Sequence, residues 1–557
     1  MKLDAISRLQ RDARRVSEII AVLARYGLAD WLKGLNYAWI QDRLRSADGQ
    51  AISGLKPEER LRLAFSELGT TFIKLGQMLS TRADLVGAAV AEELAKLQTN
   101  APADPIEQVY ATIQAELGRP PQEIFADFDP EPMASASIAQ VHAARLPSGE
   151  EVVVKVQHVG IGKNILSDLE ILAALAELAQ KHSAPLRLLR PVDLVRQFRR
   201  TLLRELDFTR ERQNLEEFAR HFADDDTVYF PAPFRSYSTQ RVLTMERLTG
   251  ISVSEPEALA SCGADLNEFA RRGATMYLEM IFRDSFYHAD PHPGNLMLLS
   301  AETIGVIDCG MVGRLDEELR QGIEELLVAV SERDAGRLTE VVLRLSDAPP
   351  NCPREQVRAD LNELLTDYVG QPLEDFKVGE VLARLVEIVR RYQMALPPEL
   401  AQLLRTLVLL EGTSRLLNPD FSLAEVLRPY YFKMMRRRFA PQRILAHLRR
   451  SVRDWERFLE TLPLNLGDVL DRLRSGKFEI RLDHRHLEPS INRLVMGLLT
   501  ASLFLGSTLL WSLKAPPVLG GVSVFGAAGY LLAMWWGWRL FRAIHRSGDI
   551  DSSDDKR

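Results

Sequence analysis

Two aspartates and an asparagine lie close together in the middle of the chain. Asp290 and Asn295 are five positions apart in the stretch FYHADPHPGNLML, and Asp308 follows in VIDCG. One carboxylate can orient an attacking hydroxyl or water, while an amide oxygen and a second carboxylate can hold Mg²⁺ on phosphate oxygens. The spacing therefore predicts phosphoryl transfer, with Asp290 as the catalytic residue and Asn295 and Asp308 as metal ligands.

Two other interpretations of this stretch are open at this point. His288 and His292 alternate with Asp290, as transition-metal ligands can, but two prolines fix an irregular loop and no third histidine or cysteine lies nearby. The other alternative is a tight turn in which Asp290 and Asn295 only satisfy backbone groups. Residues elsewhere in the chain decide between the three.

The upstream residues favour phosphoryl transfer. VVVKV places Lys155 on a strand of β-branched residues, where a lysine can neutralise the α- and β-phosphates of ATP, and a later helix supplies Glu211 as its ion-pair partner. These residues follow the order found in protein kinases. A kinase, however, has a Gly-rich loop before this lysine, and here an alanine- and serine-rich turn takes its place. We expect this turn to cover the nucleotide through Ala134, Ser135, Ala136, Ser137, Ile138, Ala139, Gln140 and Val141.

The elements that must position these residues indicate an α+β fold. Apolar residues three or four apart predict helices, whereas HAARLPSGEEVVVKVQH reads as two strands around a turn. The expected order is helices in 1–125, strands near 127–160, helices in 163–222, a strand near 241–250, helices in 265–283, a short strand at TIGVIDCG, and helices from 317 to about 459. No A-P-E sequence follows IDCG, so a peptide-docking segment is not expected.

Length and composition are those of an ordinary folded protein with several domains. The chain has 557 residues, 46% of them hydrophobic, and a net charge of −6, which argues against a nucleic-acid binder. Three scattered cysteines favour a reducing compartment. The N-terminal 28 residues have no secretory-signal pattern and predict an amphipathic helix, which either packs on its own domain or lies on a membrane surface.

The C-terminal region contains two uncharged stretches, Leu494–Leu513 and Val518–Trp538, joined by KAPP. Each is long enough to cross a bilayer, and tryptophans lie at their ends. Arginines flank the pair (Arg493, Arg539, Arg542 and Arg546), whereas the turn holds only Lys514, so the rest of the chain should stay in the cytoplasm. The alternative is a buried hairpin of a soluble protein.

A basic stretch precedes this region. Residues 430–458 contain nine lysines and arginines, which fits contact with anionic lipid headgroups or, equally, a solvated helix face paired with acidic neighbours.

Taken together, these motifs resemble the UbiB-like atypical kinases, also called the AarF-domain or ADCK family. The resemblance covers roughly residues 20–430 and includes KLGQ (Lys74 to Gln77, the family's KxGQ), ASASIAQVH, Lys155, ELD (Glu205 to Asp207, its ExD), HADPHPGN and IDCG. The C-terminal hairpin is similar to that of the bacterial members that serve ubiquinone biosynthesis. Ser135 and Cys309 are mild departures, because many relatives have alanine at the first position and kinases have phenylalanine at the second.

The resemblance implies a bilobal kinase-like fold whose N-terminal extension lies over the cleft, with Lys74 and Gln77 facing Glu205 and Asp207. It also implies ATP and Mg²⁺ as cofactors and an ATPase or kinase that supports prenyl-quinone biosynthesis at the bacterial inner membrane. The implied partners are anionic lipid, quinone precursors, other enzymes of the pathway and a second copy of the chain. A lipid or small-molecule kinase, or a nucleotide-binding scaffold without turnover, are the alternative functions.

The expected domains are a helical extension (1–125), a kinase-like N-lobe (126–255), a helical C-lobe (256–430), basic juxtamembrane helices (431–492), a transmembrane hairpin (493–541) and a cytoplasmic tail (542–557).

Overall fold

The computed structural model describes residues 13–28, 55–97, 101–182, 190–300, 302–367, 377–438, 487–519 and 522–545. It forms two compact units, residues 1–443 and 444–557, which we describe separately. Three predictions lie wholly or partly outside the described residues: the first part of the N-terminal helix, most of the basic stretch after residue 438, and most of the tail. The expected domain boundaries stay predictions.

The N-terminal part of unit 1 is a set of short amphipathic helices, as the three/four spacing predicts. They are α2 (Ala13–Arg25), α5 (Pro57–Leu68), α6 (Thr70–Ser80), α7 (Ala83–Val86) and α8 (Ala88–Ala95). The apolar faces of α2, α5, α6 and α8 pack with the helices at 161–182 and 191–205 in one core cluster, in which Ala64, Leu94 and Leu169 are fully buried. The extension is therefore held by apolar packing as well as by the polar contacts described below.

A four-stranded antiparallel sheet of order β1-β2-β3-β5 carries the lysine of the site. The strands are β1 (Asp127–Ser135), β2 (Ala139–Arg145), β3 (Glu151–Gln157) and β5 (Val242–Glu246), and α9 (Ile106–Leu117) and α10 (Pro121–Ile124) precede them. Side chains alternate along β3, so Val152, Val154 and Val156 are buried in a core shared with α9, and Lys155 points to the opposite face. The β1 strand lies within the range 127–160 in which strands were expected, but the sequence did not single it out, because its two prolines and irregular pairing break the alternation.

The residues that the structure describes between β3 and β5 include three helices. They are α11 (Ile161–His182), α13 (Pro191–Glu205) and α14 (Phe208–His221). Asp207 ends the turn between α13 and α14 and caps α14, since its Oδ1 accepts hydrogen bonds from Thr209 N at 3.1 Å and Thr209 Oγ1 at 2.6 Å. This cap fixes where α14 begins, and with it the position of Glu211 in the first turn.

The remainder of unit 1 is mainly helical and surrounds short strands, and the two aspartates of the site follow the ends of two of them. A second sheet has the order β4-β9-β8-β6, and β7 pairs with β10. The strands are β4 (Val228–Tyr229), β6 (Ile251–Ser252), β7 (Phe286–His288), β8 (Leu296–Leu298), β9 (Ile304–Val306) and β10 (Val312–Arg314).

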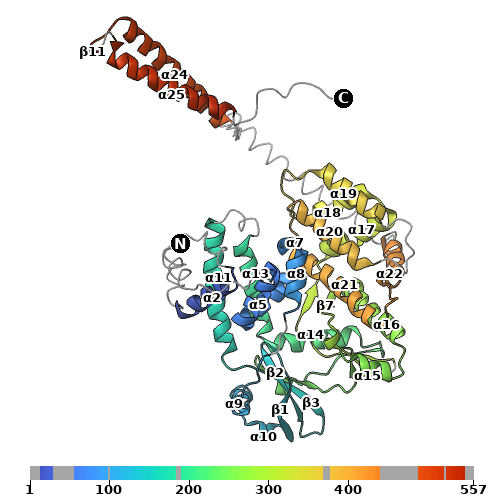
Figure 1. Cartoon of the computed structure of the whole chain (residues 1–557). Coiled ribbons are helices and arrows are strands. Elements are labelled where there is room, and N and C mark those ends of the chain that lie inside the picture. Colours follow the sequence, from blue (N-terminus) through green and yellow to red (C-terminus); the bar gives the residue numbers. More distant parts are fainter. Residues whose placement is uncertain are drawn as a thin grey trace, which may run out of the picture. The chain divides into compact units, whose positions relative to one another are not determined.

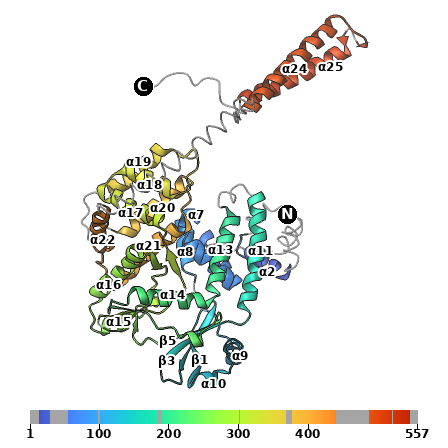
Figure 2. The same cartoon turned by 180° about the vertical axis from the view of Figure 1, so that it is seen from behind.

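The helices of this part are α15 (Pro256–Ser261), α16 (Leu266–Glu279), α17 (Glu317–Glu332), α18 (Ala335–Leu345), α19 (Arg354–Asp367), α20 (Val378–Arg391), α21 (Pro398–Leu417) and α22 (Leu423–Arg438). Short 3₁₀ turns η1 (Arg235–Tyr237) and η3 (Pro293–Asn295) and the π-helical turn η2 (Met280–Asp284) join them. Figure 1 and the reverse view in Figure 2 place the β1–β5 sheet at one end of unit 1 and α17–α20 at the other. The α+β class is confirmed.

In unit 2 the structure describes residues 487–519 and 522–545. These residues form two helices, α24 (Leu487–Ser512) and α25 (Val524–His545), with two short strands between them, β11 (Val518–Leu519) and β12 (Val522–Ser523). Tyr530 of α25 contacts the rings of Phe504 and Trp511 of α24. Among the described residues one helical segment, Val495–Ser512, is long and apolar enough to cross a membrane. The second helix begins later than the expected span and extends over Arg539 and Arg542, which lowers its overall hydropathy.

Candidate active site

A cleft of about 720 Å³ in unit 1 collects most of the residues that the sequence singled out. Its lining includes Lys74, Gln77, Ala136, Ser137, Ile138, Ala139, Lys155, Glu205, Asp207, Glu211, Asp290, Asn295 and Asp308. These residues come from six stretches of the chain, from α6 to the segment between β9 and β10. Ala134, Ser135, Gln140 and Val141 are not among the residues that line it.

Lys155 is held between two carboxylates. Its Nζ lies 2.9 Å from both oxygens of Glu211 and 3.4 Å from Asp308 Oδ2. The Lys155 and Glu211 side chains are 16% and 6% exposed, whereas the Asp308 side chain is 45% exposed. The lysine is thus oriented by a buried carboxylate, and the Asp308 carboxylate remains accessible from the cleft.

These charges shift one another's pKa values. Burial alone would lower the pKa of Lys155, but the charges of Asp308 and Glu211 outweigh it and raise that pKa. Partial shielding from water would raise the pKa of Asp308, but Lys155 and the hydrogen bond from Gly310 N at 2.8 Å hold it at about 2. Burial raises the pKa of Glu211 despite its contact with Lys155. Asp308 is therefore ionised at neutral pH, as a cation ligand must be.

The loop after β7 brings Asp290 and Asn295 together. Asn295 Nδ2 donates to the Asp290 carbonyl at 3.1 Å and approaches Asp290 Oδ2 at 3.4 Å. With the amide nitrogen engaged in this way, the amide oxygen Oδ1 is the atom that Asn295 can offer to a cation. An Asn oxygen, an ionised Asp and phosphate oxygens form a donor set that suits Mg²⁺.

His288 has a structural role in this loop. It is 1% exposed, and its Nε2 faces the Asp308 carbonyl at 2.5 Å, while its Nδ1 faces the Tyr277 hydroxyl at 3.2 Å and the Asp290 N–H at 3.3 Å. The ring thereby joins the backbones of Asp290 and Asp308. This arrangement favours the phosphoryl-transfer interpretation of the stretch over the transition-metal one, because both ring nitrogens already have partners.

Cys309, which replaces the phenylalanine of the kinase D-F-G, is fully buried. Burial and the charge of Asp308 raise the pKa of its thiol well above the usual value. Its carbonyl accepts a hydrogen bond from Asn214 Nδ2 of α14 at 2.9 Å, which ties the Asp308 segment to the helix that carries Glu211.

The alanine- and serine-rich turn between β1 and β2 is fixed from two sides. Thr70 Oγ1 of α6 donates to the Ser137 carbonyl at 3.1 Å, and His158 Nε2 lies 2.9 Å from the Ala136 carbonyl. The Gln140 side chain accepts from Asp104 N at 2.7 Å and contacts His142 Nε2 at 2.8 Å. Gln140 thus braces the turn, and the cleft is lined by residues 136–139.

Lys74 of the KxGQ helix α6 meets the ExD segment, as the resemblance implies, whereas Gln77 Nε2 donates to the Leu97 carbonyl at 3.3 Å. Lys74 Nζ lies 2.8 Å from Glu205 Oε2 and forms an ion pair with it. This oxygen is buried and accepts no hydrogen bond from the described residues. Asp207 instead caps α14 and lies 3.8 Å from Arg210. Gly76 allows α6 to approach Leu97 closely, since a Cβ there would lie 2.2 Å from Leu97 Cδ1.

Sequence reasoning missed the contribution of α21 to the cleft. Thr413 Oγ1 donates to the Pro291 carbonyl at 2.8 Å. The one hydroxyl proton of Thr406 is shared between the Gln402 carbonyl at 2.9 Å and the Ala289 carbonyl at 3.1 Å, so α21 contacts both sides of Asp290. Arg405 and Gln402 of the same helix line the cleft. One signal was present in the sequence. Arg405 lies within the largely apolar run LAQLLRTLVLL, and a charged residue in such a run is rarely buried unless it has a function or a partner.

A strand lysine paired with a helix glutamate, next to an Asp-x₄-Asn loop and an Asp-Cys-Gly segment, defines a kinase-like protein. Three family models match the chain: the ABC1 atypical kinase-like domain over residues 96–342, the UbiB helical domain over 361–422, and the ABC1/UbiB kinase-like C-terminal domain over 480–546. The chain therefore belongs to the ABC1/UbiB family.

Similar curated proteins carry the name "Probable protein kinase UbiB". That of Pseudomonas fluorescens is 37% identical over 482 residues, or 85% of this chain and 88% of the relative. That of Azotobacter vinelandii is 35% identical over 535 residues, or 93% of this chain and 95% of the relative. A solved structure of the Rv3197–erythromycin complex from Mycobacterium tuberculosis is 24% identical, with a TM-score of 0.43, over 65% of this chain and 92% of that chain.

Proposed function

We propose that this protein is a membrane-anchored atypical kinase or ATPase that binds Mg-ATP and supports ubiquinone biosynthesis. The observation that carries the proposal is the position of Lys155, whose ammonium contacts both Glu211 and Asp308 in the cleft that also contains Asp290 and Asn295. The family relatives named UbiB point to ubiquinone as the quinone concerned.

Each residue has a defined task in this proposal. Lys155 binds phosphate oxygens of the nucleotide and is oriented by Glu211, while the backbone of residues 136–139 covers the phosphates. Asn295 Oδ1 and Asp308 hold Mg²⁺, which when bound neutralises charge on the phosphate oxygens. Asp290 orients the attacking hydroxyl or water and accepts its proton.

The decisive experiment is Mg²⁺-dependent ATP hydrolysis by the full chain in nanodiscs of neutral or anionic lipid, with a soluble quinone-precursor analogue present or absent. We expect turnover in the wild type and a loss of at least about 100-fold in Asp290→Asn, Lys155→Ala and Asp308→Asn. Thr366→Val, an exposed change on α19, is the control. Turnover at the wild-type rate in Asp308→Asn would refute the metal assignment.

The same assay distinguishes the other candidate functions. Transfer of label from γ-labelled ATP to a lipid or a quinone precursor would identify a small-molecule kinase, in which Asp290 serves a hydroxyl instead of water. ATP binding that depends on Lys155, without any turnover, would identify a nucleotide-binding scaffold.

Membrane anchoring in this proposal rests on α24 and α25. The Val495–Ser512 segment is apolar and largely unburied, with Leu498, Leu505 and Leu509 more than half exposed. Cations at the outer ends of the two helices and a single lysine between them favour a cytoplasmic location for unit 1 at the inner membrane. We expect the full chain to resist carbonate extraction from membranes, and recovery in the soluble fraction would contradict this.

A further inference from the structure

Arg405 of α21 is a positive charge in the cleft that the proposed chemistry does not yet use. The residue lines the cleft together with Asp290 and Lys155, and its side chain is mostly withdrawn from water. Its one hydrogen bond among the described residues is weak, from its Nη1 to the Gln77 carbonyl at 3.5 Å. A guanidinium has five N–H donors, so most of its bonding capacity remains unfilled.

The other two cations deep in the cleft have close carboxylate partners. Lys155 contacts Glu211 and Asp308, and Lys74 contacts Glu205. Within the described part of the chain, no carboxylate lies within 4.0 Å of Arg405. A charge that is largely removed from water without a partner is costly, unless a ligand supplies the opposite charge.

Electrostatics agree with this geometry. Burial lowers the pKa of Arg405, and the charge of Asp290 opposes that shift, which places the two side chains within each other's field. An anion bound by Arg405 would therefore lie at the Asp290 end of the cleft. In phosphoryl transfer this is where the terminal phosphoryl group must be, since Asp290 serves the group that attacks it.

We propose that Arg405 binds the terminal phosphoryl group of the nucleoside triphosphate, so that helix α21 adds a charged residue to the catalytic site. This inference rests on the proposed function. In the transfer step, the bond from the β,γ-bridging oxygen to the γ-phosphorus breaks and the bond from the attacking oxygen forms. The proton of the attacking group passes to Asp290. Arg405 keeps its protons throughout and stabilises negative charge on the γ-phosphoryl oxygens.

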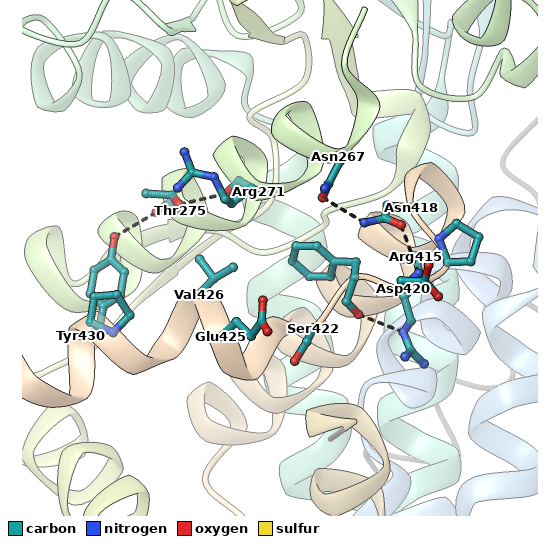
Figure 3. A pocket seen from close by; sticks show the side chains of 13 residues that line it. Asn267, Arg271, Thr275, Arg415, Asn418, Asp420, Ser422, Glu425, Val426 and Tyr430 are labelled. Atoms are coloured by element: carbon teal, nitrogen blue, oxygen red, sulfur yellow. Dashed lines mark hydrogen bonds between the residues drawn. The ribbon is translucent and has the colours of Figure 1, made fainter. Parts of the chain in front are cut away.

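A matched control lies on the same helix. Arg415 is ten residues further along α21, and its Nε donates to the Phe421 carbonyl at 3.2 Å. Figure 3 shows a separate pocket, in which Asn418 donates to Asn267. Arg415 lines this pocket, whose volume is about 940 Å³. It has the same charge and the same helix as Arg405, but it is absent from the lining of the catalytic cleft.

The test compares ATP with ADP, because only ATP carries the γ-phosphoryl group. Affinities of both nucleotides for the full chain in nanodiscs are measured with Mg²⁺ for the wild type, Arg405→Gln, Arg405→Lys and Arg415→Gln. We expect Arg405→Gln to weaken ATP binding about 10- to 100-fold, with ADP binding changed less than about twofold. Arg405→Lys should lie between the wild type and Arg405→Gln, and Arg415→Gln should match the wild type.

Three results would overturn the inference. Equal losses for ATP and ADP would show that Arg405 supports the whole site and not one phosphate. Unchanged ATP binding, with a lost response to the quinone-precursor analogue, would assign the arginine to an anionic second substrate. A wild type that binds neither nucleotide would refute the proposed function itself. Melting temperatures of all variants, and the retained charge in Arg405→Lys, separate these results from misfolding.

Discussion

His142 illustrates how one buried side chain can make stability depend on pH. Its ring is 0% exposed, with Nδ1 2.9 Å from the Asp129 carbonyl and Nε2 2.8 Å from the Gln140 amide. Burial lowers its pKa below the usual 6.5. The folded state therefore resists a proton that the unfolded chain accepts, so the stability is present above about pH 6.5 and decreases as the pH falls below it.

We accordingly predict that the melting temperature of the wild type falls between pH 7.5 and pH 5.5 by more than that of His142→Gln. The variant lacks a group that titrates in this range, although it loses some packing at both pH values. Thermal unfolding of the two proteins in the same detergent checks the prediction. Parallel decreases in the two proteins would assign the pH dependence to other groups.

A second prediction at the residue scale concerns Glu211. In Glu211→Gln, Lys155 keeps only Asp308 as a charged partner, so the lysine and Mg²⁺ compete for the same carboxylate. We expect the Mg²⁺ concentration for half-maximal ATP hydrolysis to rise by about tenfold, the loss typical of one charge-assisted contact. A titration of activity with Mg²⁺ measures this, and an unchanged requirement would show that Asp308 is not shared.

At the scale of elements, helix α21 supports the loop that carries Asp290, although the two are far apart in the sequence. Thr413 is 6% exposed and donates its one hydroxyl hydrogen bond to the Pro291 carbonyl. We expect Thr413→Val to lower stability by about 1 kcal/mol and to reduce the rate of ATP hydrolysis more than it affects ATP affinity. The reason is that the loop loses a fixed point beside Asp290, while Lys155 is untouched.

The comparison variant is Thr366→Val, which removes an exposed threonine hydroxyl bonded to the Asn362 carbonyl within α19. Thermal melts and steady-state kinetics of both variants separate stability from positioning. Equal kinetics for Thr413→Val and wild type would mean that the loop keeps its position without α21.

A residue of the site could be predicted from the sequence when its neighbours along the chain mark its role. The sequence predicted four residues of the site because their types and their order along the chain match those of kinases, and the structure brings them into one cleft: Lys155, Glu211, Asn295 and Asp308. Arg405 and Thr413 were not, because their partners are more than a hundred residues away and nothing near them marks the pairing. Asp207 was expected to face Lys74, whereas in the structure its carboxylate caps the N-terminus of α14.

At the scale of the whole unit, the N-terminal extension is joined to the C-terminal helices by a buried ion pair. Arg82 and Asp84 contact each other at 2.8 Å, with side chains 7% and 1% exposed. Arg82 Nη2 also donates to the Leu396 carbonyl at 3.2 Å, and Asp84 Oδ2 accepts from Leu396 N at 3.3 Å. The pair thus connects α7 to the residues that lead into α21.

We predict that Arg82→Ala destabilises unit 1 by about 3–5 kcal/mol, because it leaves Asp84 buried without a charged partner. The double variant Arg82→Ala/Asp84→Ala should be less destabilised than the single one, since it removes the unpaired charge. Melting temperatures of the three proteins test this. A double variant that is less stable than the single one would show that the pair contributes more than mutual neutralisation.

The Asp290 loop and the helix α21 that supports it are far apart in the sequence, which has a consequence during protein synthesis. The Pro291 carbonyl and the Thr413 hydroxyl that bonds to it are 122 residues apart. At about 5–20 residues per second, the ribosome delivers the second roughly 6–24 s after the first. During that interval the Asp290 loop exists on the nascent chain without the helix that fixes it. In the proposed function, full nucleotide turnover would therefore begin when translation of the kinase-like region is nearly complete.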